Sequence, residues 1–123
     1  MTIRQCSSWE VDGERRFPTK RVQAALEIGH RQTFIQDRAQ FGYEQLRSLT
    51  LGQVKELLQI RLFIRCGDNH PDYSRANFNR LFNNNRTRIQ GQEFESLSAL
   101  FESKQISVEQ EFQTIVEVLN GNH

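Results

Sequence analysis

The sequence predicts an all-α protein, a compact bundle of about five helices to which a small N-terminal β-hairpin can be added. Leu, Ile, Val and Phe supply 34 of the 123 residues, enough for one hydrophobic core of single-domain size. Two prolines and seven glycines are few for an all-β or loop-rich chain. We expect residues 1–17 to form an N-terminal arm or hairpin and residues 18–121 to form a single helical domain.

The N-terminal segment carries the signal for the hairpin. Asp12-Gly13 supplies the positive φ angles that a two-residue hairpin turn needs. This turn would place Val11 opposite Glu14. Because an isolated hairpin is marginal in water, we expect Phe17 to pack against the helices. An irregular arm is the alternative.

A long helix is expected to follow Pro18, which fits the first helical turn. Apolar residues recur at helical spacing from Val22 to Ala39, so the helix is predicted to run on towards Phe41. Gly29 inside it costs about 1 kcal/mol of helix stability.

The next helix has clear signals at both ends. Thr50 and Gln53 have the spacing of a capping box, in which each side chain bonds the backbone amide of the other residue. Gly67 is a good C-terminal stop. Apolar residues cover more than half of the circumference between these ends, so we expect this helix to lie buried at the centre of the bundle. A short helical turn is expected between Gly42 and Thr50.

A turn is predicted at residues 68–72, and Asp72 or Ser74 can cap the helix that follows. The asparagines at 83–85 are suited to end that helix, because Asn tolerates the left-handed conformation and competes for backbone hydrogen bonds. One apolar stripe is expected to face the core, and it consists of Phe78, Leu81 and Phe82.

Two further helices are expected to close the chain. Residues 93–104 contain apolar side chains at helical spacing. Residues 107–120 begin with a second capping box, Ser107 with Gln110, and end before Gly121. This last helix is amphipathic, which makes it a candidate seam for a homodimer.

Positive charge is concentrated before residue 90, although the net charge of the chain is only +1. Residues 1–90 hold fifteen Lys or Arg against nine Asp or Glu, whereas residues 91–123 hold one Lys against six Glu. Thirteen of the cations are arginines, whose forks suit phosphate and guanine better than lysine does. The segment Tyr73–Ile89 alone contains four arginines, five asparagines and no acidic residue. A nucleic-acid contact is therefore expected there, with a merely solvated polar helix as the alternative.

The helical spacing of this segment defines the candidate site. If Phe78 and Leu81 face inward, then Asn79, Arg80 and Asn83 face outward. Asn can pair bidentately with adenine and Arg with guanine, while arginines in the loop beyond the helix would hold phosphates. A helix selected only for solubility usually mixes both signs of charge, and this one does not. The expected nucleic-acid-binding residues are Arg75, Asn77, Asn79, Arg80, Asn83, Asn84, Arg86 and Arg88, the last two in the loop.

The stretch "SRANFNRLFNNNRTRIQGQEFESLSALFE" resembles the second half of a phage-repressor-like helix-turn-helix domain, with an S-R-x-x-x-x-R helix, a polar loop and an x-L-x-x-L helix. "LTLGQVKELLQI" is similar to the preceding helix of that family, so the resemblance covers about residues 49–102. It implies that the outward residues of the S-R helix touch bases and that the later arginines touch the DNA backbone. One departure is the connection "RLFIRCGDNHPDY", which replaces a turn of three or four residues.

Two functions of different classes follow. The first is a small DNA-binding protein, a transcriptional regulator, with helix 74–85 in the major groove and the acidic C-terminal helices on the far side. The second is an all-helical interaction or adaptor module that docks the same surface on an acidic protein partner without touching nucleic acid. RNA binding, with Tyr73 stacked on splayed bases, is a third option.

Catalysis, cofactors and membrane insertion are not expected. Neither His30 nor His70 belongs to a recognisable catalytic pattern, and no phosphate loop or dinucleotide fingerprint is present. Cys66, Asp68 and His70 lack the second ligand pair of known zinc sites. No window of eighteen apolar residues exists and no signal peptide is recognised, so a cytoplasmic protein with free thiols is expected.

Overall fold

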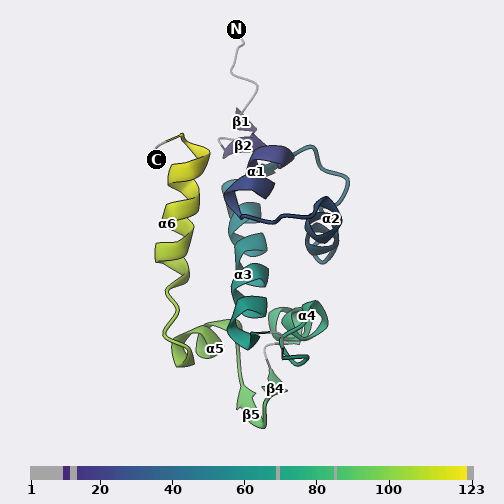
Figure 1. Cartoon of the computed structure of the whole chain (residues 1–123), viewed down its shortest axis with the longest axis vertical. Coiled ribbons are helices and arrows are strands. Elements are labelled where there is room, and N and C mark those ends of the chain that lie inside the picture. Colours follow the sequence, from purple (N-terminus) through teal and green to yellow (C-terminus); the bar gives the residue numbers. More distant parts are fainter. Residues whose placement is uncertain (1–9, 12–13, 69, 85, 122–123) are drawn as a thin grey trace, which may run out of the picture. The chain divides into compact units, whose positions relative to one another are not determined.

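The computed structural model describes residues 10–11, 14–68, 70–84 and 86–121. These residues are predominantly helical, with six helices, a three-stranded antiparallel sheet and a two-stranded one (Figure 1). The strands make the all-α expectation too narrow. The chain forms two compact units, which we describe separately. The first contains the described residues up to Leu57 and from Gln113, and the second contains those from Leu58 to Phe112.

The sheet of the first unit consists of β1 (Glu10–Val11), β2 (Glu14–Pro18) and β3 (Ser48–Thr50). Val11 pairs with Glu14, as the Asp-Gly turn predicts. The hairpin does not stand alone, because β2 also pairs with β3 and sets Phe17 opposite Leu49. Both of these side chains are buried. The helical turn expected before Thr50 is wrong in its last residues, where the chain instead completes the hydrogen bonding of β2.

Two helices replace the long one that was predicted after Pro18: α1 (Thr19–Ala25) and α2 (Arg31–Ala39). Helical structure is interrupted at Glu27, whose φ of 58° lies in the left-handed region. The side chain of Gln23 spans the break, and its Nε2 donates to the Ile28 carbonyl at 3.0 Å. Apolar residues on both sides keep the helical spacing, so periodicity alone did not reveal this break.

The central helix, α3 (Leu51–Gly67), begins at the predicted capping box. The Thr50 amide donates to Gln53 Oε1 at 2.9 Å, and the Gln53 amide donates to Thr50 Oγ1 at 3.2 Å. Asp68 follows the helix with a left-handed φ of 47°. The prediction of a buried helix is confirmed by its fully or nearly fully buried side chains, which are Val54, Leu57, Leu58, Ile60, Leu62 and Phe63.

The second unit continues with α4 (Arg75–Asn84), which starts and stops where its sequence predicts. The Asn77 amide donates to Ser74 Oγ at 3.4 Å, so Ser74 acts as the N-terminal cap. On the inner side, the Phe63 ring of α3 lies 5.9 Å from the Phe78 ring and 5.4 Å from the Tyr73 ring, measured between ring centroids. These three aromatic side chains form the centre of the core of this unit.

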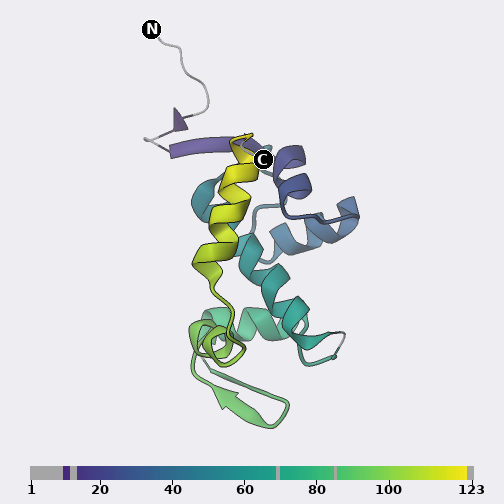
Figure 2. The same cartoon turned by 60° about the vertical axis from the view of Figure 1, so that its left-hand side comes forward.

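A β-hairpin follows α4 where a loop and the start of a helix were predicted (Figure 2). It consists of β4 (Thr87–Ile89) and β5 (Gln92–Phe94). Gln90 and Gly91 between them have φ values of 52° and 84°, the positive values that a two-residue hairpin turn requires. Helix α5 (Leu97–Ser103) begins only after the hairpin.

Helix α6 (Val108–Leu119) has the predicted N-terminal cap, since the Gln110 amide donates to Ser107 Oγ at 3.3 Å. At its other end, the guanidinium of Arg21 donates to the Leu119 carbonyl. Cations stabilise the carbonyl end of a helix dipole. None of the described helices combines the length and the apolar composition that crossing a membrane would require.

Candidate nucleic-acid interface

Helix α4 separates apolar from polar side chains, as its sequence predicts. Phe78 and Leu81 are buried, whereas Arg80 and Asn83 are exposed. Phe82 is the exception, because 38% of its surface is exposed and its ring stacks on Phe78 at a centroid distance of 5.8 Å. The prediction that Phe82 lies in the core is therefore wrong.

Two asparagines on the outer face form a pair one helical turn apart. Asn83 Nδ2 donates to Asn79 Oδ1 at 2.8 Å. This bond does not engage the Asn79 amide nitrogen or the Asn83 amide oxygen. A donor and an acceptor therefore stand next to each other on the surface, which is the combination that the adenine edge in the major groove requires.

Arg80 is exposed and lies between the two asparagines in sequence. Its side chain makes no hydrogen bond or ion pair with any other residue that the structure describes. α4 itself contains no acidic residue. The guanidinium of Arg80 is therefore ready to bind an anion or a base edge without first leaving a partner.

The remaining predicted residues of α4 differ in their accessibility. The Asn77 side chain is half-buried and donates to the Asp72 carbonyl, so it belongs to the turn before the helix. Arg75 is half-buried in the first helical turn, and Asn84 is exposed in the last. Helical spacing did not distinguish Asn77 from the outward asparagines, because its role depends on the path of the chain before the helix.

Arg86 lies in the connection before the hairpin, as predicted, whereas Arg88 lies in strand β4 instead of a loop. Both guanidiniums contact one carboxylate, with Arg86 at 3.2 Å and Arg88 at 3.5 Å from Glu93. All three side chains are about half to two-thirds exposed, and exposed ion pairs contribute little to stability. The group therefore carries a net charge of +1 and can exchange the carboxylate for a phosphate. Glu93 was not recognised as a partner because the pairing of Arg88 with Glu93 depends on the hairpin.

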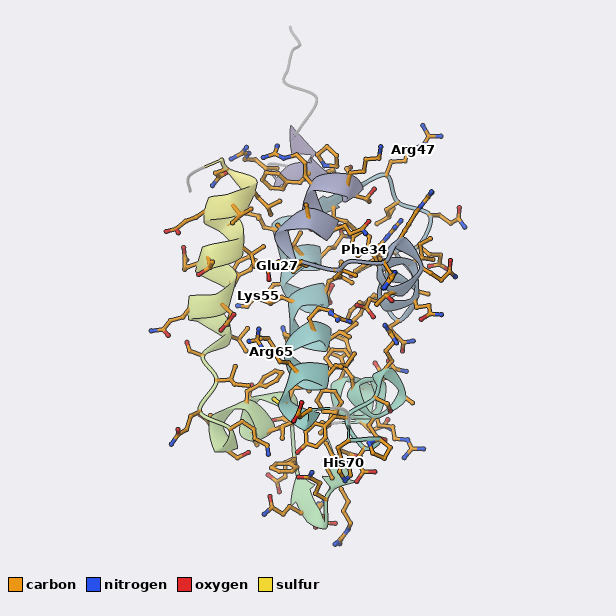
Figure 3. The ribbon with its side chains drawn as sticks, viewed as in Figure 1. Glu27, Phe34, Arg47, Lys55, Arg65 and His70 are labelled. Atoms are coloured by element: carbon orange, nitrogen blue, oxygen red, sulfur yellow. The ribbon has the colours of Figure 1, made fainter. Side chains whose placement is uncertain are left out.

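The long connection between α3 and α4 is tied to the hairpin. Asp72 Oδ2 accepts from the Gln90 amide at 3.2 Å, and the Tyr73 hydroxyl donates to Gln90 Oε1 at 3.2 Å. His70, which lies on the same connection (Figure 3), accepts from the Asp72 amide through Nδ1 at 3.1 Å. The turn of the hairpin and the start of α4 are therefore held in one arrangement within this unit.

Among the described residues, no three His, Cys, Asp or Glu side chains come close enough to hold a metal ion. Cys66 is a half-buried free thiol. Burial raises the pKa of the Cys66 thiol, which lowers its thiolate fraction at neutral pH.

Comparison of the chain with models of known protein families, with curated proteins and with solved structures gave no match.

Proposed function

We propose that this protein binds DNA through the outer face of α4 and the arginines of the β4–β5 hairpin. The observation that carries the proposal is the exposure of Arg80 beside the Asn79–Asn83 pair, on a helix without acidic residues. An α-helix with its side chains is about 10–12 Å across, which matches the major groove, about 12 Å wide. A role as a transcriptional regulator would follow from such binding.

Base contacts would come from α4. Arg80 can bond both acceptors of guanine with its fork. The unengaged amide nitrogen of Asn79 and amide oxygen of Asn83 can bond N7 and N6 of a neighbouring adenine. Because these two side chains already fix each other, less rotamer entropy is lost when they bind a base.

Phosphate contacts would come from the hairpin. Arg86 and Arg88 lie close to Asn84 in sequence, and their shared partner Glu93 neutralises only one of the two charges. Exchange of Glu93 for a phosphate oxygen replaces one exposed ion pair by another, so it costs little free energy. These contacts would hold the helix in place without reading sequence.

Two matched variants test this proposal. Arg80→Gln and Lys104→Gln each remove one exposed positive charge from the second unit, but only Arg80 lies on α4. Fluorescence anisotropy with a pool of random duplexes at low salt should give affinity about tenfold lower for Arg80→Gln and nearly unchanged for Lys104→Gln. The proposal fails if the wild-type protein does not bind the pool, or if the two variants bind it equally.

Docking on a protein is the second candidate, and the exposed ring of Phe82 favours it. Exposed aromatic side chains are typical of the energetic centre of protein interfaces. A partner with an apolar pocket would take up the Phe82 ring, and acidic groups beside that pocket would suit the cationic chain around α4. This candidate predicts that one stoichiometric partner is recovered in the presence of excess competitor DNA and is lost with Phe82→Ala. Recovery that competitor DNA abolishes would instead favour the DNA-binding proposal.

A further inference from the structure

The first unit contains an open cavity of about 590 Å³ whose lining is strongly basic. Its walls are the start of α1, one face of α2 and the segment 44–47 that leads into β3. Figure 3 shows Phe34 between α1 and α2, and Arg47 on the segment above α2. The charged side chains of the lining are Lys20, Arg31, Arg38, Arg47 and Glu44, four cations and one carboxylate.

The β2–β3 pairing brings Lys20 and Arg47 to the same wall. Pro18 at the end of β2 pairs with Ser48 at the start of β3. Beyond this pair, the Thr19 amide donates to the Arg47 carbonyl at 3.2 Å. The backbone at Lys20 and the backbone at Arg47 are therefore held beside each other by the sheet.

The other wall is α2, where Arg31 and Arg38 are seven residues apart and share one face. Arg38 is buried and fixed: Nε donates to the Tyr43 carbonyl at 3.3 Å, and Nη2 donates to the carbonyls of Glu44 and Leu46 at 2.9 and 3.0 Å. Burial lowers the pKa of Arg38, while the Glu44 charge raises it and the Arg31 charge lowers it. The positive charges of Arg31 and Arg38 on this wall therefore repel each other.

Three of the four cations are uncompensated within the part of the chain that the structure describes. The side chains of Lys20, Arg31 and Arg47 make no hydrogen bond or ion pair with any described residue, and all three residues are exposed. Cations gathered in a concave site raise the local positive potential and concentrate anions there. A bound anion would offset the repulsion among them.

We propose that this cavity binds a small molecule that carries at least two phosphate groups. Arginine forks and a lysine ammonium are the usual ligands of phosphate oxygens. Cations stand on two separate walls, so one phosphate can bind Arg31 on α2 while a second binds Lys20 and Arg47. The volume lies within the range of small-molecule sites, which is about 300–1,000 Å³. It leaves room for an organic group beside the phosphates.

Isothermal titration of the intact chain with pyrophosphate and with ATP tests this proposal. We expect saturable binding of one molecule per chain and no heat from adenosine, which carries no charge. Arg31→Gln and Arg47→Gln should each weaken binding about tenfold, because each loses a charge-assisted contact. Both positions are exposed, so an unchanged circular dichroism spectrum is expected for both variants.

Lys104→Gln is the matched control, since it removes the same charge but does not line the cavity. It should bind pyrophosphate like the wild-type protein. An equal loss in all three variants would reduce the effect to net charge and overturn the proposal, as would the absence of saturable binding. Tighter binding of citrate than of pyrophosphate would also overturn it, because the site would then select carboxylates.

Discussion

Tyr73 lies directly against the backbone of Gly67 at the end of α3. A Cβ atom added to Gly67 would stand 2.3 Å from both Cβ and Cγ of Tyr73, far inside van der Waals contact. Tyr73 is buried, and its hydroxyl bonds Gln90 in the hairpin turn. Gly67 is thus required for this close approach as well as being the last residue of the helix. The approach couples the end of α3 to the segment that precedes the candidate interface.

We predict that Gly67→Ala lowers the free energy of unfolding by about 1–3 kcal/mol, the usual cost of overpacking a core. The added methyl group would displace Tyr73, whose position the neighbouring Phe63 ring restricts. Chemical denaturation measures this cost. Gly29→Ala is the matched control, because nothing lies within 4 Å of a Cβ at that position. A loss for Gly29→Ala as large as that for Gly67→Ala would contradict the steric explanation.

Thr50→Val should lower the free energy of unfolding by about 1 kcal/mol, the typical contribution of an N-terminal cap. The substitution keeps the shape and the β-branch that suit β3 but removes the hydroxyl that accepts from Gln53. Ser107→Ala removes the cap of α6 at an exposed position, so its effect in the same denaturation experiment should be smaller. The reverse order of the two effects would show that the capping box does not define the start of α3.

Arg38→Lys should destabilise the first unit by about 2 kcal/mol although it keeps the charge. A lysine ammonium cannot reproduce the fork that bonds the carbonyls of Tyr43, Glu44 and Leu46 together. Only 8% of the Arg38 surface is exposed, and its loss as a donor would leave three part-buried hydrogen bonds to carbonyls unmade. Arg31→Lys, at an exposed position of the same helix, should change stability by less than about 0.5 kcal/mol. Equal effects would mean that charge alone matters at position 38.

Alkaline pH should weaken the fold through Tyr43. Burial, together with the bond from its hydroxyl to Glu56 at 2.5 Å, raises the pKa of Tyr43 from about 10 to about 12. A raised pKa means that the folded state holds this proton more tightly than the unfolded state. The resulting stability is complete below pH 10 and is lost as the pH rises towards 12. Denaturation midpoints should therefore fall more steeply over this interval for the wild-type protein than for Tyr43→Phe, and parallel curves would contradict the assignment.

The starts of α3, α4 and α6 were predictable because a local side chain caps each of them. Thr50, Ser74 and Ser107 each bond an amide three residues further on, and both partners lie in one short stretch of sequence. Central burial of α3 was likewise predictable, because its apolar residues cover most of its circumference. These features depend on neighbours in the chain.

The β1–β2 hairpin was predicted, but β3, the β4–β5 hairpin and the break between α1 and α2 were missed. β3 is three residues long, which is too short for an alternating pattern, and it exists because β2 offers a pairing edge. Gln90-Gly91 is a weaker hairpin signal than Asn-Gly, so β4 and β5 were assigned to a loop and a helix. Glu27 in the left-handed region divides α1 from α2 without a glycine to indicate it.

In the candidate interface, too, some features were predicted from the sequence and others were not. Periodicity correctly placed Phe78 and Leu81 inside and Arg80 outside. It failed for Phe82, which is partly exposed although it lies on the apolar side of α4. It also failed for Asn77, because the side-chain amide of Asn77 donates to the turn before the helix. The direction of a side chain follows from helix geometry, whereas its burial depends on the elements that pack against the helix.

The salt dependence of duplex binding tests the central claim most directly. The slope of the logarithm of the association constant against the logarithm of salt concentration reports how many phosphates the protein contacts. If the outer face of α4 meets DNA, the wild-type protein should show a steep slope. Arg80→Gln should then reduce the magnitude of the slope by at most about 0.9, and a reduction of about 0.9 would mean that Arg80 contacts a phosphate. Lys104→Gln should leave the slope unchanged. A duplex affinity that is undetectable at low salt, or that Arg80→Gln leaves unchanged in both magnitude and slope, would contradict the claim.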